Sequence, residues 1–183
     1  MRVIGGSAKG RRLRAPKGQA VRPTASRVKE SLFNILPRDF SGLAVLDLYA
    51  GSGNLSIEAL SRGAERAVLV DSSARSTEAI KENLIRSGFA EQAEVWLSPV
   101  ARALRSLAKR GSAFDVIFLD PPYDRGLIRP ALKIIARVNL LRASGLIVAE
   151  HSAREEVASR IDGLSLYDQR RYGDTLLSFF GHE

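Results

Sequence analysis

The sequence predicts an α/β protein with a mostly parallel, doubly wound sheet that closes with an antiparallel last strand. From residue 43 onward, short apolar runs alternate with amphipathic segments, which is the pattern of βα repeats. Two of the runs end in the motifs Asp47–Gly53 and Asp120–Tyr123. Ligands of open α/β sheets bind outside the carboxyl ends of the strands, so both motifs are candidates for a functional site.

The elements follow from hydrophobic periodicity and from glycine and proline positions. Strands are expected at 44–48, 66–71, 93–97, 114–119 and 144–150, and helices near 54–62, 74–87, 99–109, 126–138 and 153–161. Gly63 and Gly88 fit helix C-caps, and Pro99 fits a first helical turn. Two further strands, about 164–171 and 175–181, are expected to form a hairpin that turns at Tyr172–Asp174.

Residues 1–38 are predicted to form an extension to a main domain at 39–183. Residues 1–20 alternate basic and small residues around glycines, which indicates short strands in a ribbon. Thr24 is a plausible N-cap for an amphipathic helix that ends at Pro37.

Composition excludes several classes of protein and site. The chain has 183 residues, of which 45% are hydrophobic and 26% charged, as expected for one globular domain. It has no cysteine and two histidines, so disulfides and a thiol nucleophile are excluded and a metal site is not expected. No apolar run is long enough to span a membrane and no signal peptide is recognisable, so we expect a cytoplasmic protein, and a monomer by default.

Positive charge is concentrated at the amino-terminal end. Residues 1–38 hold ten Lys and Arg and one acid, a net charge of +9, whereas residues 39–183 have a net charge of −1. A localised basic patch is an electrostatic footprint for phosphate, and hence for nucleic acid. The alternative is a solvated, partly disordered tail.

The segment 45–53 predicts a cofactor loop. A strand leads into Ala50-Gly51-Ser52-Gly53, and a helix begins near Asn54, whose N-terminus offers backbone N–H groups to a nucleotide-like ligand. A dinucleotide fingerprint requires a third glycine where this chain has Ser56, which argues against NAD. Asp47 at the strand end is expected to accept hydrogen bonds from a cationic amine or from loop N–H groups; alternatively, it only braces the loop.

Asp71 is a candidate ligand for a ribose. It ends the second predicted strand, where an acidic side chain can accept hydrogen bonds from both hydroxyls of a ribose. The alternative is that Asp71 caps the next helix, although Ser72 or Ser73 could also do so.

Asp120-Pro121-Pro122-Tyr123 is a candidate base-binding motif. It follows the apolar run Val116–Leu119, and its prolines stiffen the chain because each fixes φ and removes a donor. A ring beside an acceptor suits a planar base with an exocyclic amine. The alternative is a plain turn.

Taken together, these motifs resemble class I S-adenosylmethionine-dependent amino-methyltransferases. The resemblance extends over nearly the whole chain and is closest to the RsmD-type family, which methylates the 2-amino group of a guanine in bacterial small-subunit ribosomal RNA. Besides Asp47–Gly53, Asp71 and Asp120–Tyr123, it rests on the segments Arg2–Gly6, Arg22-Pro23-Thr24 with Arg27, Ser31–Leu36, Glu58–Ala64 and Tyr172–Thr175.

The resemblance implies a Rossmann-like sheet and S-adenosylmethionine as cofactor. The implied cofactor-binding residues are Asp47, Ala50, Gly51, Ser52, Gly53, Asp71, Ser72, Ser98 and Asp120, with Gly51 and Gly53 along the methionine part and Asp71 on the ribose. The chain departs from the family at two positions. Where this chain has Ser98, relatives commonly have an acid that contacts the adenine amine. Where this chain has Ser56, relatives often have a glycine.

The implied reaction is in-line methyl transfer from the sulfonium to the amine of a flipped-out guanine. The implied catalytic residues are Asp120, Pro121, Pro122 and Tyr123, with Asp120 accepting from the amine and Tyr123 stacking on the base. The implied partner is 16S rRNA, within a 30S subunit or an assembly intermediate. The residues expected to contact RNA are Arg11, Arg12, Arg14, Arg22, Thr24 and Arg27.

Three other functions remain open from the sequence. The enzyme could methylate another base, such as an adenine amine in RNA or DNA, because the Asp-Pro-Pro-Tyr motif suits either amine. The chain could be a non-catalytic RNA-binding factor in ribosome assembly. A nicotinamide dehydrogenase is disfavoured by Ser56 and by the lack of a clear acid–base histidine.

Overall fold

The computed structural model describes residues 1–16 and 23–183, with side chains described for 1–16 and 27–183. The chain divides into two compact units, Met1–Ser98 and Pro99–Glu183. The predicted boundary at 38/39 stays a prediction.

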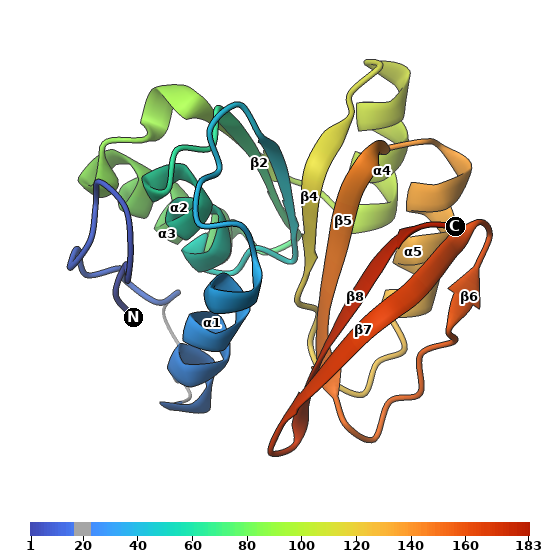
Figure 1. The fold of residues 1–183 in the computed structure, drawn as a ribbon. Coiled ribbons are helices and arrows are strands. Elements are labelled where there is room, and N and C mark those ends of the chain that lie inside the picture. The colour runs from blue at the N-terminus through green and yellow to red at the C-terminus, as the bar shows by residue number, and fades with distance from the viewer. Residues whose placement is uncertain (17–22) are drawn as a thin grey trace. The chain divides into compact units, whose positions relative to one another are not determined.

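The first unit is a parallel sheet with helices. The strands β1 (Ala44–Leu48), β2 (Arg66–Asp71) and β3 (Ala93–Leu97) are hydrogen-bonded in the order β3-β2-β1. Leu46 pairs with Val68, and Asp71 with Leu97, so the strands run parallel. The helices of this unit are α1 (Pro23–Ile35), α2 (Asn54–Ser61), α3 (Ala74–Ser87) and the short 3₁₀ helix η1 (Ala90–Gln92) (Figure 1).

The amino-terminal residues of this unit form a short antiparallel hairpin. Arg2 bridges to Arg12, and the backbone N–H groups of Val3 and Leu13 donate to the carbonyls of Arg11 and Met1, at 2.9 and 3.0 Å. The hairpin lies along α2 and α3, to which the contacts described below bind it (Figure 1). Within the described residues the pairing is one isolated bridge and not a regular strand pair, so the expected ribbon stays a prediction.

The second unit combines one parallel strand pair with an antiparallel part. Its strands are β4 (Phe114–Leu119), β5 (Leu141–Ser152), β6 (Arg160–Ile161), β7 (Leu164–Tyr172) and β8 (Thr175–His182), in the order β4-β5-β8-β7-β6. Only β4 and β5 are parallel among the pairs of this unit. Its helices are α4 (Val100–Lys109) and α5 (Ile128–Arg137). The predicted α/β class, with parallel strands and an antiparallel end, is therefore confirmed.

The predicted helix at 153–161 is wrong. Residues 153–159 form turns and irregular structure, and Arg160–Ile161 is the edge strand β6, paired with β7. The segment Ala153–Ala158 consists largely of good helix formers, but β5 extends to Ser152, and the backbone N–H of Ala153 donates to the carbonyl of Asp174 at 2.8 Å. Long-range pairing therefore overrides local helix propensity here.

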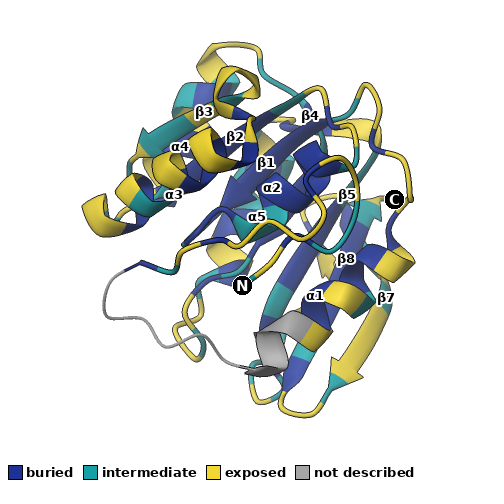
Figure 2. Cartoon of the chain, turned by 90° about the vertical axis from the view of Figure 1, so that its left-hand side faces the viewer, coloured by how far each residue is buried: buried dark blue, intermediate teal, exposed yellow. Residues whose placement is uncertain are grey.

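Burial differs between the elements: none of β3 is buried, and α2 is buried from Ser56 to Ser61. All five residues of β1 are buried, and α4 buries Val100, Ala103, Leu104 and Leu107, which lie on one face. Figure 2 shows these buried stripes in dark blue, with exposed residues on the outer helix faces. None of the helices within the described residues is long and apolar enough to cross a membrane.

Candidate active site

The loop between β1 and α2 is built from left-handed residues. Tyr49, Gly51 and Gly53 have φ values of 65°, 57° and 75°. At Gly53, the left-handed backbone favours glycine, and a Cβ would crowd Leu69 Cδ2 at 3.0 Å. The Gly53 N–H donates to the Ala50 carbonyl at 2.7 Å and closes a tight turn just before α2. The loop therefore has the compact shape that the sequence predicts.

Asp71 braces this loop from the end of β2. Its Oδ2 accepts from the Gly51 N–H at 2.9 Å, and its Oδ1 accepts from the Ser73 N–H at 2.8 Å. A carboxylate offers about four acceptor positions, so two remain compatible with the hydroxyls of a ribose. The cap of α3 is Ser73, whose Oγ accepts from the Ser76 N–H at 3.3 Å, and not Asp71.

Asp47 lies buried beneath the same loop. Its Oδ2 accepts from the Ser56 N–H at 3.2 Å and from the Ser56 hydroxyl at 3.0 Å, and only 1% of the residue is exposed. Burial raises the pKa of Asp47 to about 7, although the bonds from Ser56 oppose this shift. Sequence reasoning treated Ser56 only as a missing glycine; in the structure it is the partner that holds the buried acid.

The other predicted cofactor residues of this unit lie around the loop. Ser52 is buried, and its carbonyl accepts from Asn83 Nδ2 at 2.9 Å. Ser72 is exposed, and Ser98 is half-buried, with its N–H donating to the Asp71 carbonyl at 2.9 Å. Asp71 and Ser98 therefore lie at the same end of β2 and β3, as expected for parallel strands.

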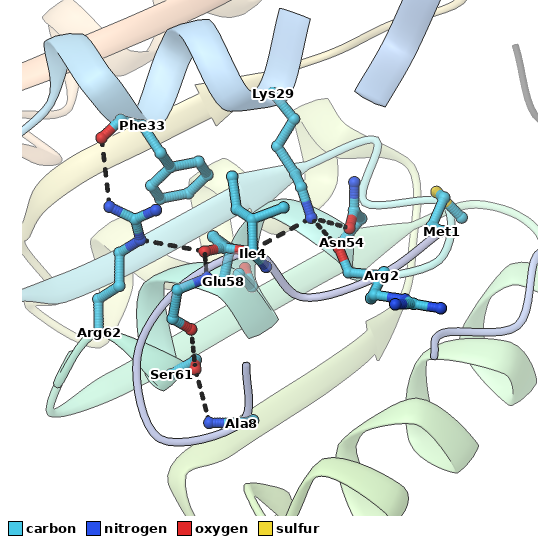
Figure 3. Close-up of polar contacts among 12 residues, drawn as sticks. Met1, Arg2, Ile4, Ala8, Lys29, Phe33, Asn54, Glu58, Ser61 and Arg62 are labelled. Carbon is cyan, nitrogen blue, oxygen red and sulfur yellow. Dashed lines mark hydrogen bonds and ion pairs between the residues drawn. The ribbon is translucent and has the colours of Figure 1, made fainter. Parts of the chain in front are cut away.

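Sequence reasoning missed a buried ion cluster beside the loop (Figure 3). The Glu58 carboxylate, fully buried in α2, accepts from the N–H groups of Ile4 and Gly5 at 2.8 Å each. Lys29 Nζ and Arg62 Nε lie 3.2 and 3.0 Å from the same carboxylate. The sequence contained one signal of this cluster, because Glu58 is an acid within the apolar face of the helix predicted near 54–62.

Lys29 extends this cluster to the first residue of α2. Its ammonium, 4% exposed, donates to Asn54 Oδ1 at 2.8 Å and to the Arg2 carbonyl at 2.6 Å. Burial lowers the pKa of Lys29, and the nearby Glu58 opposes that shift. Helix α1 and the hairpin are thereby bonded to the residue that directly follows Gly53.

The residues predicted to contact RNA differ in their surroundings. Arg12 and Arg27 are exposed. Arg11 Nη1 donates to the Arg86 carbonyl at 2.6 Å, and the exposed Arg14 forms an ion pair of 3.1 Å with Glu82, so both also contact α3. Arg22 and the side chain of Thr24 lie outside the described residues.

In the second unit, Tyr123 is held by its hydroxyl. The hydroxyl donates to Glu150 Oε1 at 2.9 Å and lies 3.0 Å from Thr175 Oγ1. Burial, together with the negative charges of Glu150 and Asp120, raises the pKa of Tyr123, so the phenol stays protonated at neutral pH. The sequence did not indicate that Glu150 and Thr175 hold this ring.

The rest of the Asp-Pro-Pro-Tyr motif forms the rim at the end of β4. Pro121 is buried, Pro122 is exposed and Asp120 is half-buried. Leu119 pairs with Ala149, so Asp120 and Glu150 follow at the same end of two neighbouring parallel strands. Carboxylates and one aromatic ring therefore gather at this edge.

His151, next to Glu150, satisfies local bonds. Its Nε2 lies 2.8 Å from Ser178 Oγ and its Nδ1 3.0 Å from the Ser152 carbonyl. Burial lowers the pKa of His151, which favours the neutral ring. No group of three or more His, Cys, Asp or Glu among the described residues is arranged to hold a metal ion.

Comparison with known proteins gives consistent matches over the whole chain. The profile of a family described as Conserved hypothetical protein 95 matches residues 1–181. YlbH of Bacillus subtilis (strain 168), a candidate rRNA methyltransferase, is 41% identical over 180 residues, 98% of each chain. Ribosomal RNA small subunit methyltransferase D of Escherichia coli (strain K12) is 30% identical over 185 residues, which are 100% of this chain and 90% of the relative.

Solved structures of other proteins also match this chain. The protein yhhF of Escherichia coli, a candidate methyltransferase, matches with a TM-score of 0.83 and 32% identity, over 100% of this chain and 98% of the other. The hypothetical protein TTHA0928 of Thermus thermophilus matches with a TM-score of 0.81 and 31% identity, over 100% of this chain and 99% of the other. The fold of this chain is therefore shared with these proteins.

Proposed function

Because the chain belongs to the family described as Conserved hypothetical protein 95, we propose that it transfers a methyl group from S-adenosylmethionine to the 2-amino group of a guanine in bacterial 16S rRNA. The methyltransferase names of its relatives support the reaction and the substrate class. The observation that supports it most is the pair of strand-end motifs: a left-handed glycine loop braced by Asp71, and Asp120 beside a hydroxyl-bonded Tyr123.

The residues present fit the cofactor. Asp71 keeps acceptor capacity for the ribose hydroxyls after bonding Gly51 and Ser73, and the glycines of the turn at Gly51–Gly53 would let the backbone approach the cofactor closely. When bound, S-adenosylmethionine supplies a methyl group on a positively charged sulfur, which is already a good electrophile. No side chain therefore needs to act as an activated nucleophile.

The protein's contribution to the reaction is positioning. Tyr123 stacks on the flipped base, because its ring is held in place through Glu150 and Thr175. Asp120 would accept a hydrogen bond from the 2-amino group and would thereby orient the nitrogen lone pair. Orientation of two reactants can by itself supply about 7–11 kcal/mol of rate enhancement.

The proposal also concerns the RNA partner and the place in the cell where the protein acts. The exposed Arg12 and Arg27 bind RNA phosphates, and the substrate is 16S rRNA in a 30S subunit or an assembly intermediate. We propose that the protein acts in the cytoplasm as a monomer.

A measurement of S-adenosylmethionine binding distinguishes this function from that of a non-catalytic assembly factor. Replacing Asp71→Asn removes the charge from a group that both braces Gly51 and binds ribose. A hydrogen bond to a charged group contributes about 1.5–3 kcal/mol, so affinity for S-adenosylmethionine should fall by about 10- to 100-fold in calorimetry.

The matched control is Glu82→Gln, which removes an exposed acid of α3 and should leave the affinity unchanged. Wild-type affinity in Asp71→Asn would contradict the assigned role. A wild-type protein that does not bind S-adenosylmethionine would favour the assembly-factor function instead.

A further inference from the structure

A buried amide on α3 bonds the amino-terminal hairpin to the proposed cofactor loop. It belongs to Asn83, which is fully buried. Its Oδ1 accepts from the N–H of Arg14, the residue after the paired part of the hairpin, at 2.9 Å, and its Nδ2 donates to the Arg14 carbonyl at 2.9 Å. The same Nδ2 donates to the Ser52 carbonyl, also at 2.9 Å. Nothing in the reaction described above uses this side chain.

These three bonds fix the orientation of the amide. Arg14 presents one N–H and one carbonyl, and Ser52 presents a second carbonyl, so the oxygen of the amide must face the N–H and its nitrogen must face the two carbonyls. A flipped amide would lose all three bonds. The Asn83 side chain therefore holds the Ser52 carbonyl at a defined position relative to the hairpin.

Ser52 is the part of the loop on which such a contact would act. It lies between Gly51 and Gly53, whose left-handed φ values are 57° and 75°. Ser52 is itself buried, and a buried carbonyl without a hydrogen-bond donor costs free energy. Asn83 supplies a donor from a position 31 residues along the chain. The loop conformation that the glycines permit is therefore stabilised by a side chain of another helix.

Two further contacts join the hairpin to the same stretch of backbone. The Ser52 hydroxyl donates to the sulfur of Met1 at 3.6 Å. Lys29 donates to the Arg2 carbonyl at 2.6 Å and to Asn54 Oδ1 at 2.8 Å (Figure 3). Together with the buried amide, these contacts connect the hairpin at more than one point to the loop and to the first residue of α2.

We propose that Asn83 is a positioning residue, which holds the Ser52 peptide against the hairpin in the conformation that binds S-adenosylmethionine. This inference rests on the proposed function and adds to it, because it gives the hairpin a role in cofactor binding besides its proposed contacts with RNA. A loop that is already ordered binds its ligand more tightly, since less conformational freedom is lost on binding. Without the amide, that ordering would have to accompany cofactor binding.

The test measures S-adenosylmethionine binding to Asn83→Ala by calorimetry, at a temperature at which the variant is fully folded. Loss of the hydrogen bond to the loop should lower the affinity by about 3- to 10-fold. In methyl incorporation, the KM for S-adenosylmethionine should rise by the same factor. The kcat with saturating cofactor and RNA should stay within about twofold of wild type, because a residue that only orders the loop does not act on the reacting groups.

Ser61→Ala is the matched control. Ser61 bonds the turn of the hairpin to the last residue of α2, at the opposite end of that helix from the loop. Its hydroxyl donates to the Gly5 carbonyl at 2.6 Å and accepts from the Ala8 N–H at 2.9 Å. The control therefore also loses hydrogen bonds to the hairpin and should lower the free energy of unfolding, but it should leave the affinity and the KM for S-adenosylmethionine unchanged.

Asn83→Leu has nearly the same shape as the wild-type residue but no hydrogen-bonding group. It should raise the KM in the same way, and it replaces the alanine variant if the cavity left by alanine prevents folding. Wild-type affinity in the Asn83 variant would overturn the inference. A loss of affinity in Ser61→Ala as large as that in the Asn83 variant would also overturn it, because lower stability alone would then explain both.

Either of these results would leave the proposed function intact. A wild-type protein that did not bind S-adenosylmethionine would contradict the proposed function, and the inference with it.

Discussion

Asp47 shows how one side chain can couple the loop to pH. The carboxylate lies 1% exposed under the loop and accepts two bonds from Ser56, yet burial still raises its pKa to about 7. The cost of burying the charge therefore exceeds what the two bonds return. The interpretation that Asp47 braces the loop agrees with this geometry, and its role toward the cofactor stays a prediction.

Stability should depend on pH through this residue. The pKa of Asp47 is about 7 in the folded protein and about 3.9 in an unfolded chain, so folding favours the protonated form. The stability that this contributes is fully present below about pH 4 and is lost as the pH rises through 7. Asp47→Asn cannot titrate. The free energy of unfolding of wild type, measured by denaturant titration relative to this variant, should therefore fall between about pH 5 and 8. A constant difference over that range would contradict the shifted pKa.

Among single residues, the sequence suggested candidate site residues at strand ends more readily than the residues that hold them by hydrogen bonds. Asp71 and Tyr123 were proposed as site residues because acids and rings at strand ends suggest ligands, and their roles stay predictions. The partners Glu150 and Thr175 lie 27 and 52 residues from Tyr123, so these contacts depend on the pairing of β4 with β5 and of β5 with β8. Local spacing contains no information about such a contact.

At the scale of elements, α2 is the centre of the first unit. Its Glu58 receives donors from the hairpin, from α1 and from Arg62 of the next turn, and the close approach of the hairpin requires glycine at Gly6, where a Cβ would lie 1.7 Å from the Ser61 carbonyl oxygen. The same helix begins directly after Gly53. The basic amino-terminal segment and the proposed cofactor loop are therefore bonded to one helix.

Breaking the cluster should destabilise the fold strongly. Glu58→Gln leaves the buried Lys29 without its counter-charge, and loss of one partner of a buried ion pair costs about 3–5 kcal/mol. The free energy of unfolding, measured in urea, should fall by that amount. The matched control Glu82→Gln breaks the Arg14–Glu82 pair, whose side chains are 60% and 53% exposed, and should cost less than about 1 kcal/mol. Equal effects of the two changes would contradict the structural importance of the cluster.

Most element bounds could be predicted, because buried parallel strands have distinctive apolar runs. The strands from 44–48 to 114–119 and the late hairpin were confirmed within a few residues, and Gly88 ends α3 as expected. The helix at 153–161 was wrong because residues with high helix propensity follow β5 in a segment that long-range pairing shapes. A two-residue edge strand such as β6 has no local pattern to detect.

For the whole molecule, charge and function are distributed unevenly. The proposed cofactor residues belong mainly to the first unit and the proposed base-binding residues to the second. That Asp47–Gly53 and Asp120–Tyr123 serve one reaction stays a prediction. The motifs Asp47–Gly53 and Asp120–Tyr123 are contiguous, so the sequence could suggest them, but it could not suggest the contacts that hold them.

The net charge of +9 on residues 1–38 should produce salt-dependent RNA binding. The affinity for 16S rRNA should fall linearly with salt on logarithmic axes, and Arg12→Ala should reduce the slope by about 0.7–0.9 if one phosphate contact is lost. Filter binding at several salt concentrations measures this. The control Arg137→Ala, which removes an α5 cation paired with Asp162, should leave the slope unchanged. An unaltered slope in Arg12→Ala would remove this residue from the RNA-binding surface.

The most direct test of the account is methyl incorporation from radiolabelled S-adenosylmethionine. Substrates are 30S particles and bare 16S RNA from cells that lack the protein, and nucleoside analysis identifies the product. The account predicts label in 2-methylguanosine, and a rate lowered by about 100-fold or more in an Asp120→Ala protein that still folds and binds cofactor. Label in another nucleoside, no label despite bound cofactor, or a full rate in Asp120→Ala would contradict it.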